Sequence, residues 1–412
     1  MPRLSTSLVL LSLLLGFLLL GRAELTAAGP RRDFAGLYNA QRRLQLDTRR
    51  EADSLHFYLL FPDGSVLQRQ YPLRVAAWSG YDARRPLWQD TVRHLSRRIR
   101  PVGAAAWVEF SLPAATLTPG QVLSLTCGPV DEADSGAGAW LTITPERLGR
   151  TFLLTDSVGD PLLRRAVRVG AQVRVDSYGP ELPVLARLYS TAGFSAALPP
   201  MTDLATQPAA PRTLGLVDSL FFRAGQELRL RRPGLYALRV GANLRPLPLL
   251  VEDNEFPELK TADDLIQPLI YLTTSAERKK LYNAPNPKQA VDAFWLAVAN
   301  NNQTMARQLI RTYYGRVAEA NQLFSAHKAG WRTDRGLLYI VLGPPEAVYR
   351  TATEERWVYR DTGRGNATYT FRPKPSTFAP EHYELVRRPE YELLWYAAVE
   401  QWRKGLTAPT GR

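Results

Sequence analysis

The chain has 412 residues, 45% of them hydrophobic, and a formal net charge of +13. This hydrophobic fraction excludes disorder throughout the chain, and the length predicts two or three domains. A single cysteine, Cys127, cannot form an intramolecular disulfide or a thiolate zinc site, which excludes disulfide-stabilised domains and zinc ribbons.

Residues 1–23 have the pattern of a secretory signal peptide. Arg3 precedes an apolar block from Leu8 to Leu20, and the small residues Gly21 and Ala23 follow at the spacing of a signal-peptidase site. The block is short for a membrane span, and no later segment has roughly 20 apolar residues. We therefore expect an exported chain with no transmembrane span after processing, an uncleaved anchor being the alternative. An exported chain with one cysteine is typical of bacteria.

Residues 53–149 predict a first β-sandwich-like domain. It follows residues 24–52, for which we expect a docking arm or a short helix. His56–Phe61 and Ser65–Leu73 flank a Pro-Asp-Gly turn and predict a hairpin. The charged segment Arg85–Arg100 predicts a surface helix or a long loop. Further strands are predicted at Arg74–Ser79, Ala105–Leu112, Gln121–Cys127 and Ala139–Thr144.

Residues 150–252 have the same texture and predict a second β-sandwich-like domain. Short strands at regular spacing, separated by Gly and Pro, are typical of antiparallel sandwiches. Leu198–Pro211 predicts an exposed loop, and residues 253–286 a linker with a short helix near Asp263–Leu281. The predicted strands are Arg150–Leu154, Ala171–Ser177, Pro183–Ser190, Glu227–Leu230, Leu235–Val240 and Leu247–Glu252.

Residues 287–405 predict an α+β domain with its own core, ahead of a flexible tail at 406–412. Residues 282–412 hold five of the nine tryptophans and ten of the 18 tyrosines, and aromatic density of this kind is typical of a packed core. Asn286-Pro287 predicts the start of a first helix.

Two further helices are predicted in this domain. Thr304–Lys328 carries apolar residues at alternating steps of four and three, which predicts a helix, and Gly330 suits its C-terminus. A closing helix is predicted from Pro389 to Gly405, where it is expected to cover a sheet.

The sequence Gly-Trp-Arg-Thr-Asp-Arg-Gly at residues 330–336 forms a distinctive motif between these helices. The apolar run Leu337–Leu342 follows it and predicts a buried strand, which a rigid Gly-Pro-Pro turn ends. We interpret the motif as a structural joint in which Trp331 packs at the helix end while Thr333 and Asp334 bond nearby backbone amides. The alternative is a polar binding site formed by Asp334, Arg335 and Arg332. The motif residues are Gly330, Trp331, Thr333, Asp334, Arg335, Gly336, Gly343, Pro344 and Pro345.

This Gly-Trp-x-Thr-Asp sequence, with the apolar run and Gly-Pro-Pro after it, resembles the GWxTD domain, a family of exported bacterial proteins familiar from the Bacteroidetes lineage. The resemblance covers roughly 287–405, including Trp357-Val358-Tyr359, Tyr369-Thr370-Phe371 and the helix from Trp395 to Trp402. It implies a domain type and an exported context but no reaction, because the family has no established activity. Many relatives look lipid-anchored, and this chain lacks the cysteine that such an anchor needs.

Candidate catalytic residues are few. The chain lacks the usual metal, nucleotide and serine-hydrolase motifs, so we expect no cofactor and no metal site. Cys127 ends a predicted strand, which favours a buried thiol over a nucleophile. His382 and Glu384 share a strand face, but two ligands do not close a metal site. Paired carboxylates for glycoside chemistry would have to come from Asp334, Glu346, Glu354 and Glu355.

The positive charge is spread evenly, with +7 on residues 1–281 and +6 on residues 282–412. Such a distribution favours attraction to anionic envelope polymers over a nucleic-acid groove. We expect solvated faces at two arginine clusters, Arg97, Arg98 and Arg100, and Arg229, Arg231 and Arg232.

The leading hypothesis is a non-enzymatic, multidomain protein that is periplasmic, outer-membrane-associated or secreted. Two antiparallel β-sandwich-like domains precede an α+β domain, which binds an unknown protein or an anionic envelope polymer, and no nucleic acid. The alternative is a carboxylate-dependent carbohydrate- or peptidoglycan-active hydrolase.

Overall fold

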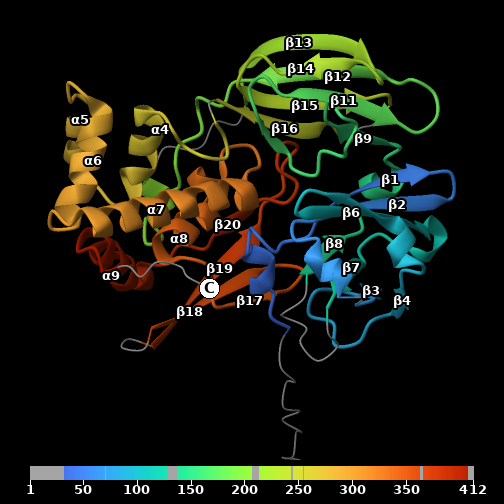
Figure 1. The fold of residues 1–412 in the computed structure, drawn as a ribbon, viewed down its shortest axis with the longest axis horizontal. Helices are drawn as coiled ribbons and strands as arrows, with labels where there is room; N and C mark the ends of the chain where they lie inside the picture. Colours follow the sequence, from blue (N-terminus) through green and yellow to red (C-terminus); the bar gives the residue numbers. More distant parts are fainter. Residues whose placement is uncertain are drawn as a thin grey trace, which may run out of the picture. The chain divides into compact units, whose positions relative to one another are not determined.

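A computed structural model describes residues 32–69, 71–128, 137–206, 213–242, 245–253, 255–361 and 365–406. The predicted signal peptide and the tail after Leu406 lie outside the described residues. The described chain forms several mostly antiparallel sheets and a C-terminal helical region (Figure 1). This arrangement confirms a β-rich, multi-sheet fold class. No helix in the described part of the chain has both the length and the hydropathy to cross a membrane.

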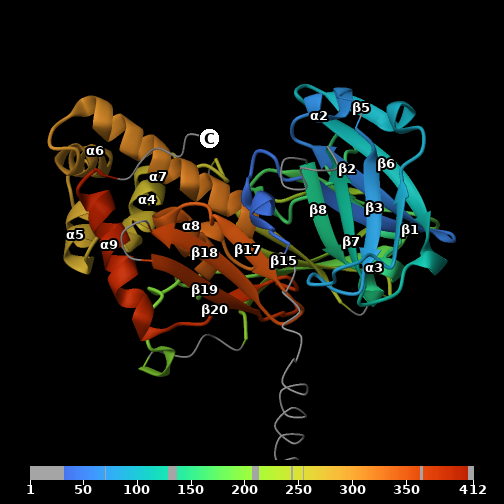
Figure 2. The same cartoon turned by 90° about the horizontal axis from the view of Figure 1, so that it is seen from below.

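The first β region consists of two four-stranded antiparallel sheets around one core (Figure 2). Alternate residues of one sheet, such as Phe57 and Leu59, meet those of the other, such as Val75 and Leu123. The intervening residues face outward, as the period of two in a strand requires. One sheet has the order β1 (Gln45–Glu51), β2 (Ser54–Phe61), β6 (Ala105–Pro113), β5 (Ile99–Val102), and the other β4 (Trp88–Thr91), β3 (Leu73–Trp78), β7 (Val122–Cys127), β8 (Ala137–Thr142).

Two local predictions for this region are wrong. The segment Ser65–Leu73, predicted to pair with His56–Phe61, begins with a helical turn, α2 (Ser65–Gln68). The chain after it enters β3, which belongs to the other sheet. The hairpin is formed instead by β1 and β2, with Glu51 opposite Ser54. The charged segment Arg85–Arg100 contains β4, the 3₁₀ turn η2 (Leu95–Arg98) and the start of β5, because edge strands need few apolar residues.

The second β region also has two sheets around one core. Its predicted strands are present within a few residues, and β10 and β13 were not predicted. β10 runs parallel to β16, whereas the other strand pairs of the described chain are antiparallel. The sheets are β14 (Glu227–Arg229), β11 (Gln172–Ser177), β9 (Phe152–Thr155), and β10 (Ala166–Arg168), β16 (Leu247–Glu252), β15 (Gly234–Val240), β12 (Pro183–Tyr189), β13 (Leu216–Arg223).

The C-terminal region packs helices and a four-stranded sheet into one aromatic core. Its fully buried side chains include Trp295, Trp357 and Trp402, as the aromatic content of this segment predicts. The sheet runs β17 (Ala347–Arg350), β18 (Glu355–Asp361), β19 (Gly365–Pro373), β20 (Tyr383–Leu385), and the helices are α4 (Ala262–Ile266), α5 (Ser275–Tyr282), α6 (Pro287–Val298), α7 (Gln303–Phe324), α8 (Asp334–Leu342) and α9 (Glu392–Arg403).

The predicted buried strand Leu337–Leu342 is wrong, because these residues belong to helix α8. A continuous apolar run fits a buried helix as well as a buried strand, and periodicity does not separate the two. Gly330 does not end the preceding helix either, since α7 ends at Phe324 and Gly330 opens a 3₁₀ turn, η6 (Gly330–Arg332). Gly343, with φ 93°, is the glycine that ends α8.

The closing helix packs on other helices. The Trp402 ring lies 5.3 Å from that of Tyr313, and its Nε1 donates to the Val341 carbonyl at 2.9 Å. The preceding turn, η7 (Pro389–Tyr391), reaches the sheet, where the Tyr391 ring lies 4.4 Å from that of Tyr369.

Segments on both sides of the predicted C-terminal domain also contribute to its core. Phe34 and Tyr38, in and beside the turn η1 (Ala35–Tyr38), lie in this core. So do Ile266 and Leu269, from the segment expected to be a linker. Capping boxes at Thr261 and Thr274 start the two helices there.

Candidate functional site

The two glycines of the Gly330–Gly336 segment allow two backbone segments to meet. A Cβ on Gly330 would lie 1.9 Å from the Ala320 carbonyl oxygen of α7, and one on Gly336 would lie 1.9 Å from the Gly330 oxygen. Thr333 caps α8, with its Oγ1 accepting from Gly336 N at 3.1 Å and donating to Gly330 O at 2.7 Å. No side chain larger than hydrogen fits at either glycine.

Trp331 fixes this segment to two neighbouring helices. Its backbone N–H donates to Asn321 Oδ1 of α7 at 3.1 Å, and its carbonyl accepts from the Tyr271 hydroxyl at 2.8 Å. The indole is 6% exposed. Trp331 is therefore a core residue, as the structural interpretation of the motif predicts.

Asp334 connects the start of α8 to strand β20. Its carboxylate accepts from Leu385 N at 2.8 Å and from Arg387 Nη2 at 2.6 Å. Both charged side chains of the ion pair are 9% exposed. Asp334 thus bonds a strand distant in sequence and not the nearby amides that we expected.

The other polar residues of the motif have separate partners. The Arg335 guanidinium lies over the Tyr383 ring, 4.7 Å from its centroid. Arg332 lies over the Trp331 ring and donates to Gln267 Oε1 at 2.9 Å. Together with the buried Asp334, these contacts do not converge on one open polar site. Of the last three motif residues, Gly343 and Pro345 are buried and Pro344 is exposed.

Glu355, at the start of β18, is fully buried and joins the N-terminal turn to this sheet. Its carboxylate accepts from the Tyr38 hydroxyl at 2.6 Å, Trp357 Nε1 at 2.7 Å and Arg350 Nε at 2.6 Å. Burial by itself raises the pKa of this carboxyl, but Arg350, Arg335 and the donated hydrogen bonds outweigh it, so the pKa lies below its usual value. Glu355 is a charged structural residue.

The carboxylates considered for hydrolysis lie in separate ion pairs. Asp334 pairs with Arg387 and Glu355 with Arg350. The remaining two pair near the surface, Glu346 with Arg360 and Glu354 with Arg356.

The thiol and the histidines are also engaged in packing. Cys127 is buried, and burial raises the pKa of its thiol. The His382 ring packs edge-on to His327 with centroids 4.8 Å apart. The described residues contain no group of three or more His, Cys, Asp or Glu side chains arranged to hold a metal ion.

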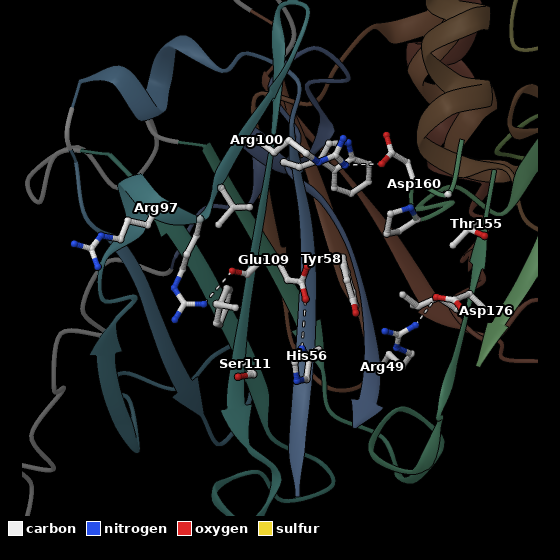
Figure 3. Close-up of a pocket in the computed structure, with 17 residues that line it drawn as sticks. Arg49, His56, Tyr58, Arg97, Arg100, Glu109, Ser111, Thr155, Asp160 and Asp176 are labelled. Carbon is white, nitrogen blue, oxygen red and sulfur yellow. Dashed lines mark hydrogen bonds and ion pairs between the residues drawn. The ribbon is translucent and has the colours of Figure 1, made fainter. Parts of the chain in front are cut away.

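A cleft of about 590 Å³ lies on the outer face of β2 and β6, bordered by β9 and the loop after it (Figure 3). His56 and Tyr58 of β2 and Glu109 of β6 point into it, because their neighbours in sequence point into the core. Tyr58 and Leu153 of β9 pack together at its base. The cleft thus lies where the two β regions meet.

Ion pairs between the two β regions border this cleft (Figure 3). Arg49 donates to Asp176 of β11 at 2.6 Å, and Arg100 to Asp160 at 2.5 Å. His56 lies between two carboxylates, with Glu51 3.5 Å from its Nε2 and Glu109 3.5 Å from its Nδ1. Each acidic group is therefore already opposite a basic one.

Two arginines of the cleft have no such partner. Arg98 is held by backbone carbonyls, donating to Arg93 O at 3.1 Å and Glu109 O at 3.3 Å. Within the described ranges neither Arg98 nor its exposed neighbour Arg97 forms an ion pair with a carboxylate. Carbonyls orient a guanidinium without neutralising it, so the cleft carries a net positive charge suited to an anionic group.

A second arginine cluster lies on the same sheet face. Asp47, which is opposite Tyr58 in the β1–β2 ladder, is buried and accepts from Arg150 and Arg165, with Arg147 at 3.7 Å. Burial raises the pKa of this carboxyl, but the three arginines outweigh burial and lower it. This cluster joins β1 to Arg147, Arg150 and Arg165 and does not line the cleft.

Comparison with known proteins identifies the C-terminal part of the chain. The family model described as the GWxTD domain matches residues 234–404. The chain carries a GWxTD domain. This match confirms the resemblance in the motif and begins at Gly234, well before the residue 287 expected from the sequence. In the fold, the GWxTD domain therefore includes β15 and β16 as well as the aromatic core.

Other comparisons add little to the GWxTD assignment. HBP35 of Porphyromonas gingivalis is similar over 51% of this chain, at 12% identity and a TM-score of 0.18, and the chain spans 62% of that structure's length. Squid arrestin is similar over 54% of this chain and 98% of its own, at 11% identity and a TM-score of 0.15. These scores are too low to support an argument. No curated protein matches the chain.

Sequence reasoning identified the GWxTD motif but missed the cleft. Arg97, Arg98 and Arg100 are exposed, as expected of a solvated face, and all three also line the cleft. The sequence did contain one indication of it, because polar or aromatic residues such as His56 and Tyr58 alternate with core residues in β2 and β6. Only the pairing of these strands brings that alternation together with the arginines.

Proposed function

We propose that this chain is an exported, non-enzymatic binding protein of the bacterial envelope, and that its cleft binds an anionic envelope polysaccharide. In this proposal the two β regions are β-sandwich-like modules that form the binding surface. The GWxTD domain serves as the platform that holds them. The protein is periplasmic, outer-membrane-associated or secreted.

The observation that carries the proposal is the pair Arg97 and Arg98. Both are exposed, both line the cleft, and Arg98 is oriented by two carbonyls while no carboxylate pairs with it in the described chain. An oriented, unneutralised guanidinium binds phosphate or carboxylate groups through paired N–H donors. We place the binding surface in the cleft instead of at the GWxTD motif because Trp331, Thr333 and Asp334 are buried.

Retention of the full chain on immobilised lipopolysaccharide tests this proposal. The wild-type protein should be retained at low salt and released by a sodium chloride gradient, because salt screens the attraction. Arg97→Gln combined with Arg98→Gln should elute at clearly lower salt, with an unchanged melting temperature.

The matched control is Arg84→Gln combined with Arg85→Gln. These two exposed arginines lie in the same β region, outside the cleft lining, and the change in net charge is identical. Equal shifts for the two double variants would show that overall charge, and not the cleft, causes retention. The hydrolase alternative stays a prediction, and release of soluble fragments from peptidoglycan would support it over our proposal.

A further inference from the structure

Strand β13 (Leu216–Arg223) leaves one backbone edge free. Among the described strands it is the last of its five-stranded sheet and pairs with β12 alone. Its exposed side chains include Leu216, Val217, Leu220 and Phe221, the last at 81% exposure. A long, apolar edge strand is the usual template for pairing with a further strand.

The two faces of this edge differ in charge. Ala186 of β12 points into the core opposite Leu220, so Phe221 and Arg223 point to the other, outer face. Arg187 and Arg239 of the neighbouring strands lie on that outer face too, opposite Ser219 and Leu185.

No carboxylate of β12, β13 or β15 lies on the outer face beside these arginines. Among the residues of β12, β13 and β15, Asp218 is the only carboxylate; it lies on the core side and pairs with Arg232 at 3.5 Å. Within the described residues, Arg187, Arg223 and Arg239 take part in no ion pair. The outer side of the free edge therefore carries Phe221 beside three unpaired arginines, and its core side carries Leu220 and the paired Asp218.

We propose that β13 accepts an extended, acidic segment of a partner protein as an added strand. The free amides and carbonyls supply the backbone hydrogen bonds, and alternate side chains of the added strand face the two sides. Acidic side chains would meet the arginines on the outer face, next to Phe221, and apolar side chains would cover Leu220 on the core side. This surface is separate from the cleft.

A second copy of the chain fits this edge less well. Symmetric antiparallel pairing keeps corresponding faces on the same side of the joined sheet, so the arginines of both copies would share one face. Like charges placed across a strand pair are destabilising. An acidic partner strand avoids this repulsion.

The test uses a fluorescent ten-residue peptide of alternating valine and glutamate with the full chain. Anisotropy should show binding with a Kd below about 1 mM, and a valine–lysine peptide should bind at least about tenfold more weakly. Phe221→Ser and Arg223→Glu should each weaken binding about tenfold. Leu393→Ser is the matched control, because Leu393 is also 81% exposed but lies on α9, and it should bind normally.

Backbone pairing is tested with two N-methylated forms of this peptide. Alternate amides of a strand point to opposite edges, so only one set, that of the valines or that of the glutamates, can bond β13. One of the two methylated peptides should therefore lose binding, and the other should bind normally. Equal binding of the lysine peptide, no binding of either peptide, or normal binding by Phe221→Ser would overturn the proposal. A wild-type dimer in sedimentation equilibrium that Phe221→Ser dissociates would also overturn it, in favour of a second copy.

Discussion

The C-terminal core and the first β region differ in where their charged side chains lie. In the C-terminal core, carboxylates are buried, and each is fixed by an arginine and by N–H or O–H donors, as Asp334 and Glu355 are. In the first β region the core is apolar; Asp47 is buried among arginines on the outer sheet face, whereas Arg97 and Arg98 of the cleft are exposed. A buried charge that already has its hydrogen-bond partners cannot bind a ligand, whereas an exposed charge can. The contrast assigns structure to the motif and binding to the cleft.

The largest effect should come from closing the space at the motif glycines. Gly336→Ala places a Cβ 1.9 Å from a backbone oxygen, so we expect a loss of about 4 kcal/mol or more in the free energy of unfolding, or no folded GWxTD domain. Urea denaturation followed by tryptophan fluorescence measures it. Gly315→Ala is the control, because nothing lies within 4 Å of its added Cβ; it should stabilise α7 by about 0.5–1 kcal/mol. Similar free energies of unfolding for the two variants would contradict the close approach of the backbone at Gly336.

The buried ion pair should come next. Asp334→Ala leaves the Arg387 guanidinium buried without its partner, so we expect a loss of about 3–5 kcal/mol. Asp292→Ala removes a solvent-exposed pair with Lys288 and should cost less than about 1 kcal/mol. A small loss for Asp334→Ala, with altered lipopolysaccharide retention, would instead favour the binding interpretation of the motif.

The histidine pair should give the GWxTD domain a moderate pH dependence. Burial lowers the pKa of His327 to about 4 and that of His382 to about 3, the latter with help from the positive charge of its neighbours. The unfolded chain, with ordinary values near 6.5, binds more protons between these limits. Stability should therefore be complete above about pH 6.5 and fall as the pH decreases towards 4. Chemical denaturation of His327→Phe combined with His382→Phe should show a flatter pH profile, and an unchanged profile would contradict this.

The smallest effect on stability should come from the cleft. Arg97→Gln combined with Arg98→Gln should change the free energy of unfolding by less than about 0.5 kcal/mol, because both side chains are exposed. A large loss in thermal or urea denaturation would show that these arginines support the fold, and would weaken the contrast between the two regions.

Local sequence signals predicted much of the secondary structure. Alternation located β6, β7, β12 and β15 within a few residues, and Asn286-Pro287 marked the start of α6 through a side-chain cap and a proline at the first helical position. The apolar run Leu337–Leu342 failed because full burial removes periodicity. The edge strand β13 was missed because its exposed apolar residues do not alternate.

The sites depend on contacts between residues far apart in the chain, which sequence reasoning cannot supply. Asp334 pairs with Arg387, and Tyr38 bonds Glu355 across 317 positions. The cleft requires β2, β6 and β9 to meet. The GWxTD motif was visible because its two glycines, its tryptophan and its capping threonine lie within one short segment.

Hydrogen–deuterium exchange of the full chain, with and without lipopolysaccharide, tests the central claim most directly. We expect slower exchange at 54–61 and 95–113, which form much of the cleft, and no change across residues 234–404. Slower exchange confined to 234–404, with an unchanged cleft, would contradict it and place the binding surface on the GWxTD domain.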